Sequence, residues 1–223
     1  LVLAFVDPPE IRVPAEERGV LAGVRFLMRD RLLRVWTPAF TLLDTGWQLL
    51  FASLPVLVVG HYGANPHTLG WLFGGLGGGA LVGAFAAMRI VRRFEALTLG
   101  SAAFVCQICS LWVLAIPAPW FVAVAGMVAG GFFMSLVNSP TQALVMLRIP
   151  RHLRTQALGA FGVFQCTASP VGLVLAGQAL ARYDSRSVLV VVLSMQTVAI
   201  AVFITAALLE RSSLRAALVD SPA

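Results

Sequence analysis

The stretch VLVVVLSMQTVAIAVFITAALL, residues 188–209, runs for 22 residues without a charged side chain. A helix of about 20 apolar residues spans the roughly 30 Å hydrocarbon core of a bilayer. Five further runs of at least that length precede it, at residues 35–59, 69–88, 97–116, 120–147 and 155–181. A lipid-exposed loop or open strand cannot satisfy its backbone polar groups in that core. The sequence therefore predicts an all-α membrane protein, a bundle of six transmembrane helices.

The composition and the placement of charge agree with this class. Hydrophobic residues make up 59% of the chain and charged residues 12%, whereas soluble domains carry about 25% charged residues. Fourteen of the sixteen basic residues, all Arg, lie on one side of the predicted topology, and only Arg182 and Arg186 lie on the other. The positive-inside rule then predicts a multi-pass plasma membrane protein with both termini cytoplasmic. Because these Arg residues are dispersed over separate loops, we expect no nucleic-acid partner.

The segments outside the six runs predict the domain layout. Residues 1–6, LVLAFV, are apolar but too few to span a bilayer, so we expect the end of a truncated transmembrane helix and a fragment of a longer protein. Residues 7–34 predict a cytoplasmic linker followed by an amphipathic helix on the membrane surface, the apolar side chains recurring at helical spacing. Residues 210–223 predict a cytoplasmic tail.

Polar side chains recur on one helical face in two of the spans. In the first span they follow steps of four, three and four residues: Thr37, Thr41, Asp44 and Gln48. The fourth span carries a similar stripe: Ser135, Asn138 and Gln142. These spans are the first members of two triplets, which favours a shared aqueous path between them. The third and sixth spans are nearly uniform apolar helices, and we expect them to face lipid.

Asp44 is the one acidic residue inside a predicted span. An isolated charge at mid-membrane costs at least about 2.5–3.5 kcal/mol, so this side chain must face a cavity or a partner, or stay protonated. The functional hypothesis is a proton- or cation-coupling site. The alternative is a structural acid hydrogen-bonded to Thr41 or Gln48.

The polar stripes also supply candidate substrate contacts, namely Thr41, Gln48, Asn138 and Gln142, with Gln165 of the fifth span as a further contributor. Such side chains need not bind a substrate. Hydrogen bonds between neighbouring helices, worth less than about 1 kcal/mol each, are the alternative role.

Glycines repeat at four-residue steps in the second span, at Gly75, Gly79 and Gly83. Small residues at that spacing let two helix backbones approach closely, and van der Waals contact then stabilises the pair. We expect a helix-packing face here.

No catalytic or metal-binding motif is present. The chain lacks a phosphate-binding loop, a His-Glu-x-x-His zinc motif and a Gly-x-Ser-x-Gly nucleophile turn. Cys106 and Cys109 form a Cys-x-x-Cys pair, but inside a membrane span we expect small buried thiols. We predict no enzyme activity, no metal site and no cofactor.

Several segments, in this order and spacing, resemble the C-terminal half of a major facilitator superfamily exporter. They are GVRFL (23–27), LLR (32–34), LGW (69–71), GGGALVGA (77–84), QALVMLRIPRHLR (142–154), PVGL (170–173) and LAG (175–177). The similarity covers nearly the whole chain and is greatest to the drug-efflux branch that includes Tap-type and enterobactin-exporter-like proteins. One family feature is missing, because no Asp lies between Gly83 and Arg93 where a Gly–Asp–Arg signature is expected.

The resemblance implies half of a 12-helix fold, with an N-terminal six-helix half as the missing partner. It implies a secondary transporter, with proton-coupled efflux of amphipathic small molecules across a lipid membrane as the expected function. Two other hypotheses remain open at this point: a self-contained six-span channel or carrier acting as a homo-oligomer, and a membrane enzyme acting on lipid.

Overall fold

The computed structural model describes residues 20–91, 93–150 and 153–219, and within these residues the secondary structure is helical. The elements are α1 (Val20–Arg29), α2 (Leu33–His61), α3 (Pro66–Ile90), α4 (Ala96–Leu111), the 3₁₀ turn η2 (Trp112–Ala115), α5 (Trp120–Arg148), α6 (Arg154–Leu180) and α7 (Ser185–Val219). Helices α2, α3, α5, α6 and α7, and α4 with η2, are long and apolar enough to cross a membrane. The predicted fold class of six spanning helices is confirmed.

Helices α2, α3 and α7 extend beyond their apolar runs at both ends. Helix α3 begins at Pro66, where the Asn65 side chain accepts a hydrogen bond from the His67 backbone N–H at 3.0 Å. Helix α7 continues to Val219, through most of the segment assigned to a tail. Hydropathy shows only where the side chains become polar. The backbone hydrogen bonds of the helix continue beyond that point, up to the residue that caps the helix. The predicted helix end at residues 1–6 and the linker up to residue 19 lie outside the described residues.

Helix α1 is shorter than the amphipathic pattern suggested and is docked on the bundle. Asp30 follows its last residue, and the Asp30 carboxylate accepts hydrogen bonds from the backbone N–H groups of Leu32 at 3.0 Å and Leu33 at 2.9 Å, where the chain enters α2. The Leu27 side chain is fully buried. A Cβ on Gly23 would overlap the Gln156 carbonyl oxygen of α6, so only glycine allows this approach.

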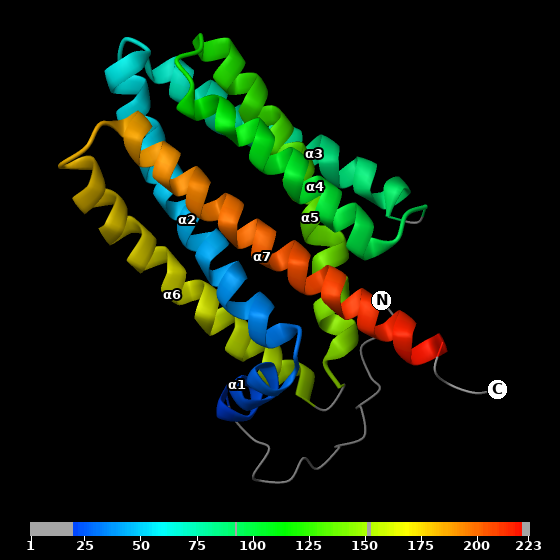
Figure 1. Ribbon diagram of the computed structural model, residues 1–223. Helices are drawn as coiled ribbons and strands as arrows, with labels where there is room; N and C mark the ends of the chain where they lie inside the picture. Colours follow the sequence, from blue (N-terminus) through cyan, green and yellow to red (C-terminus); the bar gives the residue numbers. More distant parts are fainter. Residues whose placement is uncertain (1–19, 92, 151–152, 220–223) are drawn as a thin grey trace, which may run out of the picture.

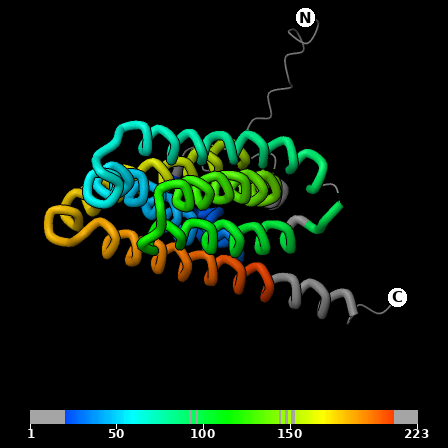
Figure 2. The backbone as a smooth tube through the Cα atoms, turned by 90° about the horizontal axis from the view of Figure 1, so that it is seen from above, coloured from blue at the N-terminus to red at the C-terminus, as the bar shows by residue number. Residues whose placement is uncertain are grey.

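The six spans form three layers. Helices α2 and α5 occupy the middle, with α3 and α6 along one flank and α4 and α7 along the other (Figures 1 and 2). Helix α2 packs against α6 and α7, and α5 packs against α3 and α4. Each central helix thus packs against the second and third helices of the opposite triplet, as in transporters built from repeated triplets.

The connections alternate between the two ends of the bundle. The α1–α2 and α3–α4 connections lie at one end with the start of α6, and the α2–α3 and α6–α7 turns lie at the other (Figure 1). Arg31, Arg93 and Arg154 therefore belong to one end, and Arg182 and Arg186 belong to the other. The arrangement keeps the charge asymmetry on which the predicted orientation depends.

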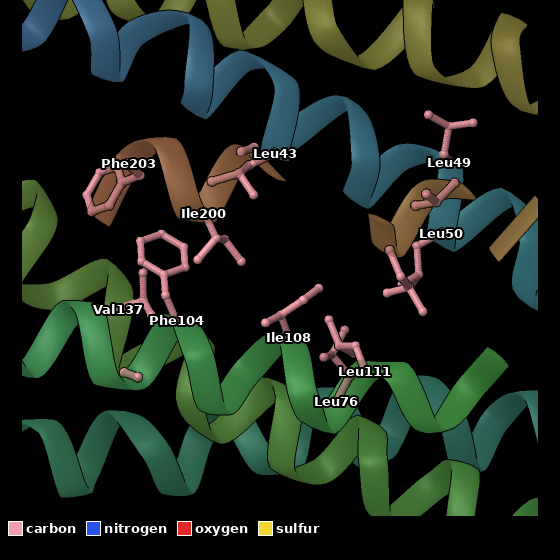
Figure 3. Close-up of a cluster of buried hydrophobic side chains, with 14 of the residues drawn as sticks. Leu43, Leu49, Leu50, Leu76, Phe104, Ile108, Leu111, Val137, Ile200 and Phe203 are labelled. Atoms are coloured by element: carbon pink, nitrogen blue, oxygen red, sulfur yellow. The ribbon is translucent and has the colours of Figure 1, made fainter. Parts of the chain in front are cut away.

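An aromatic cluster joins the middle layer to α4 and α7. Trp36 stacks on Phe203, with 4.2 Å between ring centroids, and Phe104 meets Phe203 edge-on at 4.9 Å. In Figure 3, Phe104 and Ile108 of α4 point toward Ile200 and Phe203 of α7. Stacked and edge-on rings of this kind stabilise a contact beyond their buried area.

Helices α3 and α5 approach each other at glycines. A Cβ on Gly79 would overlap the Val128 carbonyl oxygen, and one on Gly83 would overlap the carbonyl oxygen of Phe132. At Gly75 the added atom would lie 3.1 Å from a Val128 methyl group. The three glycines that the sequence marked for packing therefore all face α5.

Replacing Gly79 with Ala should destabilise the bundle, because the new methyl group has no room beside the α5 backbone. We expect a loss of about 1–3 kcal/mol, the usual cost of overpacking. Thermal unfolding in detergent measures it. Gly78→Ala is the matched control, since no heavy atom lies within 4 Å of a Cβ placed there. Equal unfolding temperatures for the two variants would contradict this account of the contact.

Candidate functional site

A cavity of about 470 Å³ lies between the central helices α2 and α5 and is bordered by α4, α6 and α7. Its volume falls in the range of small-molecule sites, about 300–1,000 Å³. The lining residues are Phe40, Leu43, Asp44, Trp47, Gln48, Phe51, Phe104, Gln107, Ile108, Leu111, Met134, Val137, Asn138, Gln142, Gln165, Gln196 and Ile200.

Asp44 is the single ionisable side chain among the described residues that line this cavity. It is partly buried on α2 and makes no hydrogen bond or ion pair with any described residue. The Thr41 hydroxyl, a proposed structural partner, donates instead to the Thr37 carbonyl oxygen at 2.9 Å. The geometry therefore favours a carboxyl group that faces the cavity over one held by Thr41.

Four predicted substrate contacts meet in the cavity although three helices supply them. Gln48 comes from α2, Asn138 and Gln142 from α5, and Gln165 from α6. Thr41 does not line the cavity, so we leave it out of the candidate site. Carboxamides both donate and accept hydrogen bonds, which suits a site that must orient polar groups of different kinds.

Close packing holds Gln48 in place. Gly172 of α6 lies directly against α2, where a Cβ would come within 2.8 Å of the Gln48 Cβ and 2.9 Å of the Thr45 carbonyl oxygen. The Thr45 hydroxyl in turn donates to the Thr41 carbonyl oxygen at 2.8 Å. The α6 contact therefore fixes the side of α2 that turns Gln48 toward the cavity.

Two further carboxamides in the cavity were missed by the sequence interpretation. Gln107 of α4 is 5% exposed and Gln196 of α7 is 2% exposed. The prediction that these two helices simply face lipid was wrong, because each places one polar side chain inside. The signal was available: Gln107 lies three residues after Phe104 and four before Leu111, on the inward face of its helix.

Aromatic side chains supply much of the remaining wall. Phe40, Trp47, Phe51 and Phe104 all line the cavity, and the rings of Trp47 and Phe51 lie 5.4 Å apart between centroids. Aromatic faces accommodate flat apolar groups and attract cations. Together with one carboxyl group and six carboxamides, they form a site of mixed apolar and polar character.

A second, larger hollow of about 1280 Å³ runs along the outer surface of α3 and α5. Glycine and apolar side chains make up most of its lining, including Gly74, Gly78 and Val128. The described residues that line it include no set of hydrogen-bonding side chains like that beside Asp44. The smaller cavity is therefore the candidate functional site.

No metal site is evident in the part of the chain that the structure describes, where no three His, Cys, Asp or Glu side chains cluster. Cys106, Cys109 and Cys166 are free thiols on the exposed surface of the bundle. The expectation of buried thiols was wrong. A small side chain is equally compatible with an outward-facing helix surface.

Two triplets of membrane-spanning helices around a cavity with one carboxyl group define the architecture of a secondary-transporter half. The chain belongs to the Major Facilitator Superfamily, whose family model matches residues 1–172 and 36–220. It is also 28% identical over 170 residues to the multidrug efflux pump Tap of Mycobacterium tuberculosis and that of Mycobacterium bovis. These matches cover 71% of this chain but only 38% of each relative. No solved structure matches the chain significantly.

Cysteine labelling tests whether the cavity contains water. In a variant without the three native cysteines, Asn138→Cys should react several-fold faster with a hydrophilic methanethiosulfonate than Val198→Cys, when both are in lipid nanodiscs. Both positions are exposed on the bundle, but only Asn138 lines the cavity. The thiolate is the reactive form and needs a polar environment. Similar rates at the two positions would argue against a water-filled cavity.

Proposed function

We propose that this chain is one half of a secondary active transporter that exports amphipathic small molecules from the cell in exchange for protons. The observation that carries the proposal is Asp44, a carboxyl group inside a spanning helix that lines a polar cavity and lacks a described partner. Membership of the Major Facilitator Superfamily and the similarity to multidrug efflux pumps support a transporter rather than an enzyme.

The coupling follows from the cost of charge in a membrane. An ionised Asp44 is costly at this depth, so the carboxylate is stabilised either by a proton or by a cationic substrate. The proton and the cationic substrate therefore compete for the same carboxylate. Proton binding on one side of the membrane therefore favours release of a cation, and substrate binding on the other side favours loss of the proton.

The other residues that line the cavity determine which class of substrate can bind. Apart from Asp44, the described lining side chains are aromatic, aliphatic, thioether or carboxamide groups. The aromatic rings stabilise an apolar or cationic body, and the carboxamides bind polar substituents. The site offers an anionic compound no countercharge, so anions should be poor substrates.

Transport by this scheme needs a second bundle. The matched region is 38% of the length of the Tap relatives, which supports an N-terminal six-helix half as the partner. The two halves would rock about the cavity so that it opens to alternate sides. The proposed setting is the plasma membrane, with the Arg-rich end of the bundle in the cytoplasm.

Replacing Asp44 with Asn should abolish proton-driven efflux of a cationic dye such as ethidium, because the amide neither binds a proton nor carries charge. The measurement is dye accumulation in cells and in inside-out vesicles, with the proton gradient intact or collapsed. It uses the protein expressed from its complete reading frame. Protein abundance should be unchanged.

Two variants control this test. Asp44→Glu keeps a carboxyl group and should retain part of the coupled efflux. Asp184→Asn removes an exposed acid at the opposite end of α6 from α1 and should have no effect. Gradient-dependent efflux that survives in Asp44→Asn would refute the coupling role of this residue.

A further inference from the structure

We propose that Gln107 of α4 is a substrate-binding residue that recognises an uncharged hydrogen-bond donor on the exported molecule. The inference rests on the proposed function and deepens it. It assigns a specific contact to α4, a helix on the flank of the bundle, whereas the coupling carboxyl group lies on α2.

The position of Gln107 directs it inward. Phe104, Ile108 and Leu111 of α4 are 4%, 5% and 1% exposed and line the same cavity. In Figure 3 these three side chains point from α4 toward α2 and α7. Residues at i, i+3, i+4 and i+7 share one helical face, so Gln107 is the polar member of an otherwise apolar inward stripe.

The Gln107 carboxamide is available to a ligand. The residue is 95% buried, and its amide makes no hydrogen bond with any described residue. Its amide oxygen and nitrogen are not among the described buried polar atoms that lack a partner, so they reach the open space of the cavity. A ligand that displaces water from the amide without replacing its hydrogen bond leaves the carboxamide unpaired, so Gln107 should discriminate between ligands with and without such a group.

Gln196 of α7 provides an internal comparison, because its carboxamide already has a structural role. Its Nε2 donates to the Leu43 carbonyl oxygen at 3.5 Å. The side chain lies over Gly46 of α2, where a Cβ would come within 2.6 Å of the Gln196 Cγ. Gln196 therefore ties α7 to the segment of α2 that carries Asp44, whereas Gln107 is left free for a ligand.

Together these positions define the ligand. Asp44 on α2 binds the cationic centre, and Phe40, Trp47 and Phe51 contact the apolar body. Gln107 on α4 accepts a hydrogen bond from an amino, hydroxyl or amide group located away from the charge. The recognised class is a flat cationic compound with a neutral hydrogen-bond donor.

Two dyes of the same charge and ring system test the inference. Ethidium carries two exocyclic amino groups, and 5-ethyl-6-phenylphenanthridinium lacks both. Their export is measured as the rate against dye concentration, in the protein expressed from its complete reading frame. The wild type should export ethidium with a kcat/KM about three- to tenfold higher than the analogue, the worth of one or two neutral hydrogen bonds.

Gln107→Met keeps the side-chain length and removes the hydrogen bond, so the preference for ethidium over the analogue should fall to near one. Gln107→Glu keeps an acceptor oxygen and should keep the preference, whatever its effect on both dyes. Gln178→Met, at an exposed position outside the cavity, is the matched control and should behave as wild type. Gln107→Leu, which also removes the hydrogen bond and should also lose the preference, covers the case in which Gln107→Met fails to accumulate.

The outcomes distinguish failure of the Gln107 site from failure of the proposed function. Export of both dyes without preference by the wild type, or a preference that persists in Gln107→Met, overturns the Gln107 site and leaves the proposed function standing. Failure of the wild type to export either dye overturns the proposed function for cationic compounds, and the Gln107 site with it.

Discussion

Backbone contact at glycines is the interaction on which the rest of this structure depends. In a bilayer the hydrophobic effect does not drive helices together, so close van der Waals packing must stabilise the bundle. Gly79 and Gly83 bring α3 onto α5, and Gly172 brings α6 onto α2. These contacts occupy one side of each central helix with a neighbour from the opposite triplet. The part of each central helix that these neighbours leave uncovered borders the cavity, with Asp44 on α2 and Asn138 and Gln142 on α5.

The sequence was sufficient to predict the six spans, because the membrane itself dictates the hydropathy and length of a spanning helix. It also sufficed for the side of α2 and α5 that faces the cavity, but not for every polar residue on it. Thr41 and Thr45 show why: a hydroxyl can donate to the carbonyl oxygen four residues earlier and needs no cavity. A carboxamide also carries an acceptor oxygen, which the carbonyl groups of its own helix cannot satisfy, so Gln48 and Asn138 were the sounder predictions.

Gln107 and Gln196 escaped prediction for the opposite reason. Each is the single carboxamide on the inward face of an apolar helix, so no stripe of polar residues indicated its role. The average hydropathy of a helix does not distinguish inward-facing from outward-facing positions. Only the angular position relative to neighbours such as Phe104 and Ile200 separates a cavity-facing amide from a lipid-facing one. The surface cysteines illustrate the same limit, since Cys106 and Cys109 lie on the exposed face of α4 beside the inward stripe.

The third helices of the two triplets also constrain how the bundle moves in the proposed cycle. Gln196 ties α7 to α2, and the Trp112 indole N–H donates to the Thr197 hydroxyl at 3.2 Å, which ties η2 to α7. Helix α2 is held on its other side by Gly172 of α6. A helix fixed on both flanks cannot tilt alone without breaking several contacts. Access to the cavity would therefore change by rotation of the whole bundle against its companion half.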